Sequence, residues 1–257
     1  MKSVMVWFLF LVVTVGGSAW AAPPESPAAT ITVLPFDNAT GKAKYAPLSV
    51  GLADMVFNDL ASSTGLQVVG KVRAAANPPT GVKEPAGLFD QAAAKAAGQA
   101  AGAAYVVVAA IRSVAPAVRI DVRAVRVADA TVVCAATASG RADHFVEAQD
   151  ALVAKVVDVL AGVLGPGDGE RIKQGAHANH PTTLAAALEY GAGLQARDGN
   201  DFESAAAHLK KAIDGQPAFA LGHSRTSDVV RALYRIKRPA PEPPPQSPRK
   251  TKTVVRP

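Results

Sequence analysis

The chain has little of the side-chain chemistry from which enzymes and metal sites are built. Among 257 residues there is one cysteine, Cys134, and there are five histidines. A single cysteine excludes an intramolecular disulfide framework and a thiolate-rich zinc site. The sequence also lacks a Gly-x-Ser-x-Gly elbow, a His-Glu-x-x-His helix and a complete phosphate loop. We therefore expect no catalytic residue, no metal and no cofactor, and we interpret the protein as a non-enzyme.

Aromatic residues are also scarce, at 5% of the chain, although 49% of the residues are hydrophobic. This apolar content is enough for a folded core, and most of it is alanine and valine. A core of such small side chains requires its helices and strands to approach one another closely. We interpret Cys134, which lies in an apolar segment, as one of these small buried residues.

The other candidates for site chemistry have simple structural interpretations. His177 and His180 are close enough in sequence to share a metal, but they lie in a polar segment without a nearby cysteine. We interpret them as solvated loop histidines. Asp37 and Asn38 follow the first predicted strand, where ligands bind in many α/β sheets. The same residue types are typical of turn capping, which we favour here.

Positive charge is concentrated at the C-terminal end. The net charge is +6, and residues 235–257, with seven Lys or Arg and one acid, carry all of it. Residues 1–234 are neutral overall, so we expect no basic face and no nucleic-acid partner. We expect the Pro-rich basic tail, residues 237–257, to be disordered. It is either an inert solubilising end or a weak, salt-sensitive contact for anionic surfaces.

Residues 1–21 have the pattern of a bacterial signal peptide. Lys2 precedes an apolar run, and small residues end the segment where a signal peptidase cleaves. The run is shorter than the roughly 20 apolar residues that a membrane-spanning helix needs. We therefore expect a mature protein that begins with a Pro-rich leader at residues 22–29. It would be soluble in the periplasm and at most peripheral to the outer membrane.

Hydrophobic periodicity predicts an αβ domain over residues 30–164. Alternation of apolar and polar residues indicates strands, and apolar residues three and four apart indicate helices. Short turns between the last three strands indicate antiparallel hairpins. We assign the fold class as α/β (α+β), a mixed five-stranded sheet flanked by helices. The expected strands are 30–36, 66–69, 104–111, 118–124 and 131–138, and the expected helices are 47–63, 90–101 and 145–163.

The C-terminal part is predicted to be a small all-α region over residues 182–236. A Gly-rich stretch after the αβ domain indicates a linker over residues 165–181. Beyond the linker, the apolar spacing predicts a helical hairpin and a third helix. The three helices are expected over residues 182–197, 201–214 and 217–235.

Several short motifs of the αβ segment occur in a recognisable order. They are ITVLPFDN (31–38), LSVGLADM (48–55), LQVVGK (66–71), GAAYVVV (102–108) and VRIDVRAV (118–125). In these motifs the segment resembles the αβ domain of the TolB amino-terminal region and of CsgG- and FlgO-like envelope proteins. The resemblance implies a mixed sheet flanked by helices. It also implies a non-enzymatic role in the bacterial cell envelope through protein–protein contacts.

The helical region resembles a single tetratricopeptide (TPR) repeat. Small or apolar residues and a closing proline stand where that repeat has them: Gly193, Phe202, Ala205, Leu209, Ala212 and Pro217. An independent solenoid needs about three repeats, so a lone repeat must cover its apolar face with something else. The third helix, the αβ domain or a partner protein could provide this cover.

These patterns predict an exported adaptor or assembly factor that contacts other envelope proteins, with its oligomeric state left open. One alternative is an outer-membrane-associated oligomer of the CsgG type, acting in secretion or surface-organelle assembly. Another is a periplasmic sensor of a small ligand. A strand with alternating outward charge is either a solvated face or a docking face. The candidate partner-binding residues are Arg119, Asp121 and Arg123 in this strand, and Tyr190, Gln195 and Phe202 in the helical hairpin.

Overall fold

The computed structural model describes residues 28–70 and 90–237. The predicted signal peptide at 1–21 and the tail from residue 238 onward lie outside the described residues, as does most of the predicted leader at 22–29. Within the described ranges, no helix is long and apolar enough to cross a membrane.

Five strands form one mixed sheet, which confirms the predicted fold class. They are β1 (Ala29–Val33), β2 (Leu66–Val68), β3 (Tyr105–Ser113), β4 (Ala117–Arg126) and β5 (Thr131–Arg141). Their order across the sheet is β2-β1-β3-β4-β5. β1 pairs in parallel with both β2 and β3, whereas β3, β4 and β5 form the antiparallel hairpins expected from their short turns.

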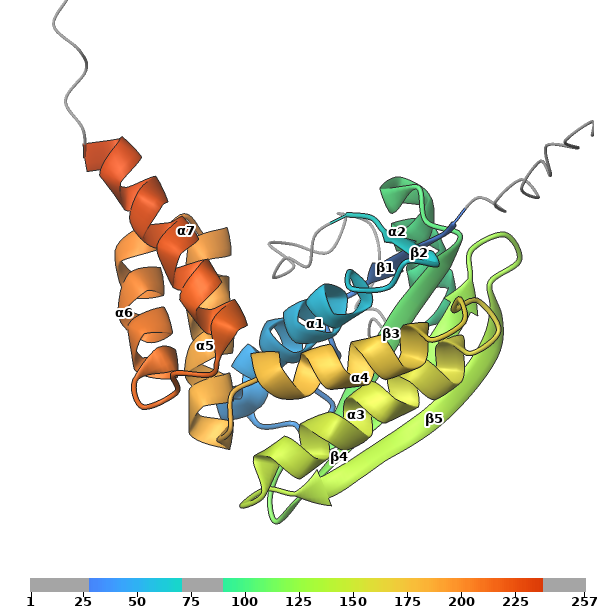
Figure 1. The fold of residues 1–257 in the computed structure, drawn as a ribbon, viewed down its shortest axis with the longest axis horizontal. Coiled ribbons are helices and arrows are strands. Elements are labelled where there is room, and N and C mark those ends of the chain that lie inside the picture. The colour runs from blue at the N-terminus through green and yellow to red at the C-terminus, as the bar shows by residue number, and fades with distance from the viewer. Residues whose placement is uncertain (1–27, 71–89, 238–257) are drawn as a thin grey trace, which may run out of the picture.

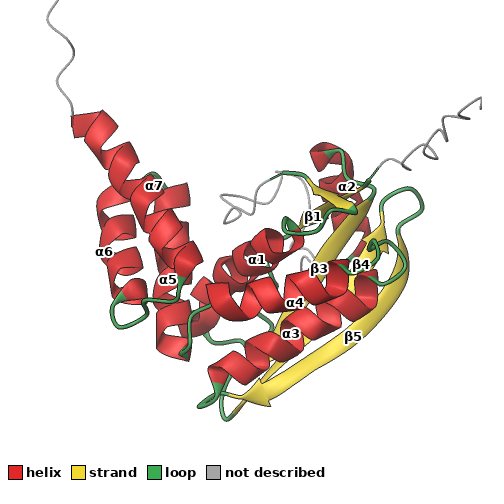
Figure 2. Ribbon diagram, viewed as in Figure 1, coloured by secondary structure: helices red, strands yellow, loops and turns green. Residues whose placement is uncertain are grey.

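Helices cover the two faces of this sheet unequally (Figures 1 and 2). The helices α1 (Ala46–Leu60) and α3 (Phe145–Leu160) pack on one face and bury the main hydrophobic core. The helix α2 (Gln91–Ala101) lies on the opposite face, over a small cluster that includes Val106 and Val125. The charged side chains of β4 lie on this second face and are only partly covered.

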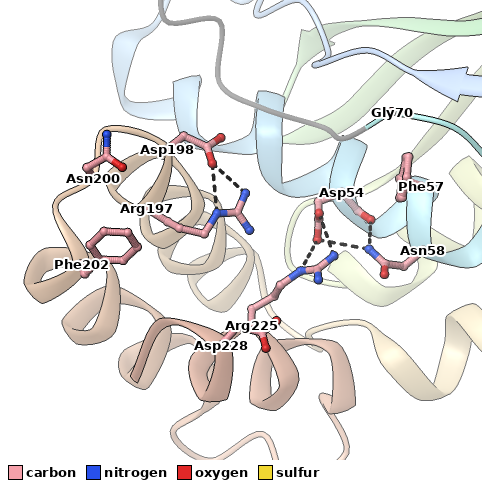
Figure 3. A pocket seen from close by; sticks show the side chains of 10 residues that line it. All are labelled: Asp54, Phe57, Asn58, Gly70, Arg197, Asp198, Asn200, Phe202, Arg225 and Asp228. Carbon is pink, nitrogen blue, oxygen red and sulfur yellow. Dashed lines mark hydrogen bonds and ion pairs between the residues drawn. The ribbon is translucent and has the colours of Figure 1, made fainter. Parts of the chain in front are cut away.

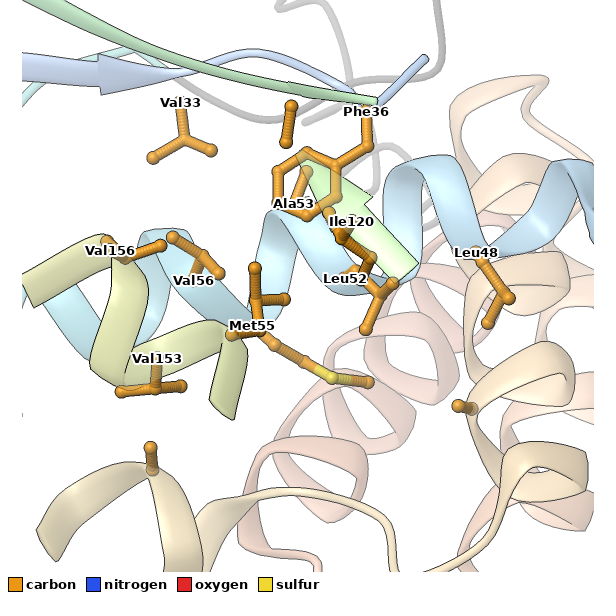
Figure 4. Packing of buried hydrophobic residues seen from close by; sticks show 14 of the residues in the cluster. Val33, Phe36, Leu48, Leu52, Ala53, Met55, Val56, Ile120, Val153 and Val156 are labelled. Atoms are coloured by element: carbon orange, nitrogen blue, oxygen red, sulfur yellow. The ribbon is translucent and has the colours of Figure 1, made fainter. Parts of the chain in front are cut away.

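The apolar side of α1 forms the centre of the core (Figure 4). Leu48, Leu52 and Met55 recur at helical spacing, and each is almost completely buried. They pack with residues that are far apart in the sequence, including Phe36, which follows β1, and Val153 of α3. A short 3-10 turn (Ala43–Tyr45) and Pro47 in the first turn lead the chain into this helix.

The strand β4 has one buried and one wet face, as its alternating sequence predicts. Val118, Ile120 and Val122 are buried in the main core. Arg119 and Asp121 alternate with them and are partly or largely exposed on the opposite face. The neighbouring strand β3 is instead buried along most of its length, which agrees with its continuous apolar sequence.

The structure corrects the predicted linker at residues 165–181, which contains the helix α4 (Asp168–Asn179). Ile172 and Ala176, one turn apart, are buried in the core shared with α1 and α3. The rest of α4 is mostly polar, so its sequence shows an apolar stripe of only one turn. Tertiary packing of that short stripe stabilises a helix in a segment whose composition is typical of a loop.

Three further helices complete the described chain: α5 (Leu184–Asp198), α6 (Phe202–Ile213) and α7 (Ala220–Lys237). α5 and α6 form the predicted hairpin, and Asn200 adopts a left-handed conformation (φ 62°) in the turn between them. α7 packs along α6, and α5 packs directly on α1. The helical region therefore shares one hydrophobic core with the αβ part.

Cys134 is exposed, which corrects the prediction that it is buried. It lies in β5, which is one of the two edge strands of the sheet. Most side chains of β5 are exposed or half-buried because only α3 covers this strand, and only on one face. A strand of small, mostly apolar residues such as β5 can therefore lie at the edge of a sheet, and its sequence alone does not predict burial.

Candidate functional site

The candidate site is a cavity of about 560 Å³ between α1 and the helices α5 to α7 (Figure 3). We call it the junction groove, and its lining residues are Asp54, Phe57, Asn58, Gly70, Arg197, Asp198, Asn200, Phe202, Arg225 and Asp228. Its volume is in the range of ligand-binding pockets. Two aromatic rings and seven charged or amide side chains line it, so it offers both apolar and polar contacts.

The deepest charged group of the junction groove is Asp54, which projects from α1 and is only 4% exposed. Its carboxylate accepts a hydrogen bond of 2.5 Å from the Tyr190 hydroxyl of α5. It also accepts two bonds, of 3.0 and 3.2 Å, from the guanidinium of Arg225 in α7. Asn58, one turn along α1, donates to the same carboxylate at 3.3 Å. Asp54 therefore joins three helices through one buried charge.

The buried carboxylate changes the titration of both partners. Burial raises the pKa of Tyr190 well above its usual value, and the negative charge of Asp54 raises it further. Burial alone would lower the pKa of Arg225, but its attraction to Asp54 outweighs this and raises the pKa. The phenol therefore stays protonated and the guanidinium stays charged at neutral pH. The cluster is a hydrogen-bonded ion pair that connects α1, α5 and α7.

A close crossing of α1 and α5 brings these side chains together. A Cβ on Gly191 would lie 1.9 Å from the carbonyl oxygen of Pro47, and a Cβ on Gly51 would lie 3.2 Å from the Cα of Gly191. Only glycine at position 191 allows the two backbones this approach. The neighbouring residue, Tyr190, is thereby held over Asp54, and its ring packs edge-on against Phe219 at a centroid distance of 5.0 Å.

The rim of the junction groove combines aromatic and charged side chains. Phe57 and Phe202 are half-buried and come from α1 and α6. Arg197 bonds to Asp198 at 2.8 and 3.0 Å, so this cation is held beside the opening. Asp228 is exposed on α7. The rim can therefore bind a ligand that carries both apolar and charged groups.

The structure separates the three hairpin residues predicted to contact a partner. Phe202 lines the junction groove, and its role as a contact residue stays a prediction. Tyr190 has no exposed surface, which corrects its prediction as a contact residue, because its ring fills the space under the groove. Gln195 is half-buried, and its side chain donates to the carbonyl of Ala46 at 3.2 Å. It therefore contacts α1 within the same chain.

The predicted strand residues Arg119, Asp121 and Arg123 lie on the other face of the sheet and line no part of the groove. Asp121 accepts bonds of 2.8 Å from both Arg112 and Thr137. Burial would raise the pKa of Asp121, but these donors lower it below its usual range. Arg112 and Arg119 therefore flank an ionised carboxylate, and a docking role for this face stays a prediction.

His180 is buried, which corrects its interpretation as a solvated loop histidine, whereas the side chain of His177 lies outside the described part of the chain. Its Nε2 lies 2.9 Å from a carboxylate oxygen of Asp59 in α1. Burial raises the pKa of Asp59, and the neighbouring imidazole partly offsets this. The pair fastens the end of α4 to α1. Across the described residues, no three His, Cys, Asp or Glu side chains are placed to hold a metal ion.

A third buried carboxylate, Asp168, fastens the start of α4 to the turn after α1. It accepts bonds from the Ser63 hydroxyl (2.7 Å) and from the backbone N–H groups of Thr64 (3.0 Å) and Gly65 (2.9 Å). It also pairs with Arg171. Burial would raise the pKa of Asp168, but these donors lower it well below its usual range. Asp168 is therefore a structural carboxylate.

Sequence reasoning missed Asp54, Asp59 and Arg225. A usable signal was present for the first two, because both acids interrupt the apolar periodicity of α1, where a charge must be paired if it is buried. Arg225 offered no such signal. It lies among polar residues of α7, and its partner is 171 positions away in the sequence.

No protein-family model and no curated protein matches the chain. A solved PelC dodecamer from Paraburkholderia phytofirmans is 15% identical with a TM-score of 0.34, over 56% of this chain and 96% of that one. A lipoprotein from Neisseria meningitidis is 18% identical with a TM-score of 0.32, over 44% of this chain and 80% of that one. TolB from Acinetobacter baumannii is 19% identical with a TM-score of 0.35, over 56% of this chain and 31% of TolB. At this level of similarity, the function must be argued from the residues of this chain.

Proposed function

We propose that the protein is an exported component of the bacterial envelope and acts as a non-enzymatic adaptor. In this proposal the junction groove binds an extended segment of a partner protein. The cavity of about 560 Å³ between α1 and α5 to α7 is the observation that supports it best. The signal-peptide pattern of residues 1–21 supports the envelope as the compartment.

The chemistry of the groove fits a peptide better than a small apolar molecule. Phe57 and Phe202 offer ring surfaces for an apolar side chain of the partner. Arg197 and Asp228 at the rim offer charged groups of both signs for polar side chains or backbone groups. Aromatic rings beside charged groups are typical of protein-binding sites.

We interpret the hairpin of α5 and α6 as one TPR-like repeat that α1 and α7 complete. In a solenoid, a neighbouring repeat would cover the apolar face of such a hairpin. Here α5 packs on α1 and α6 packs along α7. In this interpretation the junction groove, which is lined by residues of α1, α5, α6 and α7, is the side that binds the peptide.

Site-specific photo-crosslinking in cells tests the proposal. A photoreactive phenylalanine analogue at position 202 should link the chain to one defined exported protein, recovered from the periplasmic fraction. Lys211, exposed on the same helix and outside the groove, provides the matched control position. The adduct from position 202 should decrease at least tenfold in an Asp228→Lys background. Equal adducts from positions 202 and 211, or none from 202, would contradict the adaptor proposal.

A further inference from the structure

One of the two edges of the sheet is formed by β5, a long strand without charge along most of its length. β5 has 11 residues, and only the last, Arg141, is charged. Among the residues that the structure describes, β5 pairs with β4 alone, and Figure 1 shows it as the outermost strand. An edge of this kind presents unpaired backbone N–H and C=O groups that another chain can bind.

Proteins usually protect such edges with charged side chains, prolines or bulges. Apart from the charged Arg141 at its end, β5 has only a bulge. Its register with β4 shifts near its start, so Val133 has no opposite residue and is 39% exposed. From Cys134 to Arg141 the pairing with β4 is regular. The bulge therefore leaves most of the edge free to accept another strand.

The hydrogen-bond pattern identifies the backbone groups that face outward. The N–H of Ala142 donates to the carbonyl of Pro116 at 3.1 Å, so these two residues form a hydrogen-bonded pair across β5 and β4. Such pairs alternate along an antiparallel ladder. The even-numbered residues of this stretch therefore bond to β4. The backbone groups of four odd-numbered residues point to the open edge: Ala135, Thr137, Ser139 and Arg141.

We propose that β5 pairs antiparallel with β5 of a second copy of the chain, about a two-fold axis at Ala138. Thr137 then lies opposite Ser139 of the second copy, and Ala135 lies opposite Arg141 of the second copy. All four outward-facing residues gain partners, which adds about eight backbone hydrogen bonds and joins two sheets into one. No other centre between Cys134 and Arg141 pairs all four.

The side chains make this edge complementary to itself. Between Cys134 and Gly140 they are Cys, Ala, Thr, Ser and Gly, which are small and uncharged. The only charged residue, Arg141, lies at the end of the strand and faces Ala135 across the axis, so like charges do not meet. A two-fold interface requires such self-complementarity, and this argues for a second copy as the partner.

Sedimentation equilibrium on the purified full-length chain is the first measurement, and we expect a concentration-dependent dimer. Ser139→Pro removes one outward N–H group without removing a bond to β4, and proline is tolerated at such positions of edge strands. This variant should weaken dimerisation at least tenfold, whereas the control Ser139→Ala should dimerise like the wild type. A monomeric wild type, or a dimer unaffected by Ser139→Pro, would overturn the proposal.

Disulfide trapping tests the register and does not depend on the proline variant folding. In a Cys134→Ala background, Thr137→Cys together with Ser139→Cys should give a covalent dimer, because the two new cysteines face each other across the axis. Each single cysteine variant should remain unlinked, since its own counterpart lies diagonally about 7 Å or more away. Equal linking by the single variants, no linking by the double variant, or a different protein seated on β5 would also overturn the proposal. None of these substitutions lies in the junction groove, so failure here leaves the adaptor proposal standing.

Discussion

Asp54 links more of the structure than any other charged residue of the junction groove. It is buried, and it receives hydrogen bonds from α5 and from α7. A buried charge that loses its partner destabilises a protein far more than an exposed one, because the remaining charge is left without water or a counter-ion. The two donors to Asp54 should therefore differ in their effects on stability.

Replacing the cation should destabilise the protein more than replacing the phenol. Arg225→Met leaves Asp54 without its counter-ion and should lower the free energy of unfolding by about 3 kcal/mol. Tyr190→Phe removes one hydrogen bond and should lower it by about 1–2 kcal/mol. Lys210→Met breaks an exposed pair with Asp214 and serves as the control, with a change of about 0.5 kcal/mol or less. Urea unfolding measures all three, and equal effects of the first two variants would contradict this ordering.

The carboxylate of Asp168 should make stability dependent on pH only in acid. Because its pKa in the folded state is below the unfolded value of about 4, ionised Asp168 stabilises the fold above that pH. That stabilisation is lost as the pH falls through the folded pKa. Asp168→Asn should therefore cost about 2 kcal/mol between pH 5 and pH 8, and the difference from wild type should shrink below about pH 4. Urea unfolding at several pH values measures it, and a difference that grows in acid would contradict the assignment.

At the scale of elements, the crossing of α1 and α5 depends on Gly191. A methyl group there would collide with the Pro47 backbone, which cannot move without separating the helices. Gly191→Ala should therefore lower the free energy of unfolding by about 2–4 kcal/mol. Gly175→Ala is the matched control, since Gly175 is also helical and a Cβ there meets nothing within 4 Å. It should stabilise the protein by about 0.5–1 kcal/mol. Thermal unfolding measures the melting temperatures of both variants, and similar changes in melting temperature would contradict the close crossing.

The elements that sequence reasoning predicted well are those with strong periodic patterns. Polar and apolar residues alternate around Arg119, and apolar residues recur at helical spacing around Leu52. Each pattern arises because the element has one exposed and one buried face, so the local sequence is enough to predict it. α4 was not predicted because only two of its apolar residues, Ile172 and Ala176, are buried, and two residues are too few to show a helical pattern. Its stability comes from contacts with α1 and α3, which a local pattern does not contain.

The candidate site was harder to predict than the elements that carry it. Phe202 was predicted as a contact residue of the repeat-like hairpin, and it lines the junction groove, but its contact with a partner stays a prediction. Tyr190 was misjudged, since an aromatic residue in a helix can face either a groove or the core, and only the approach of α1 decides between them. The Asp54–Arg225 pair depends on the packing of α7 beside α1, which no motif in either helix specifies.

For the molecule as a whole, α1 belongs to two parts of the structure at once. One side of it packs on the sheet and α3, and α5 crosses it at Gly51. The buried pairs of Asp54 and Asp59 add polar contacts from α1 to α7 and to the end of α4. The helical region is therefore joined to the αβ part by a shared hydrophobic core and by buried polar pairs, unlike two domains that a tether connects through a small polar interface.

This sharing of α1 predicts that the two parts unfold together. Native-state hydrogen exchange should give the slowest amides of α5 and of β4 the same free energy of opening, because α5 loses its apolar cover once α1 detaches. Arg225→Met should lower both values equally, although β4 has no contact with the substituted side chain. Lys210→Met should change neither. If α5 instead opens at a free energy more than about 2 kcal/mol below that of β4, the helical region is a separate unit, and the junction groove would then open and close with it.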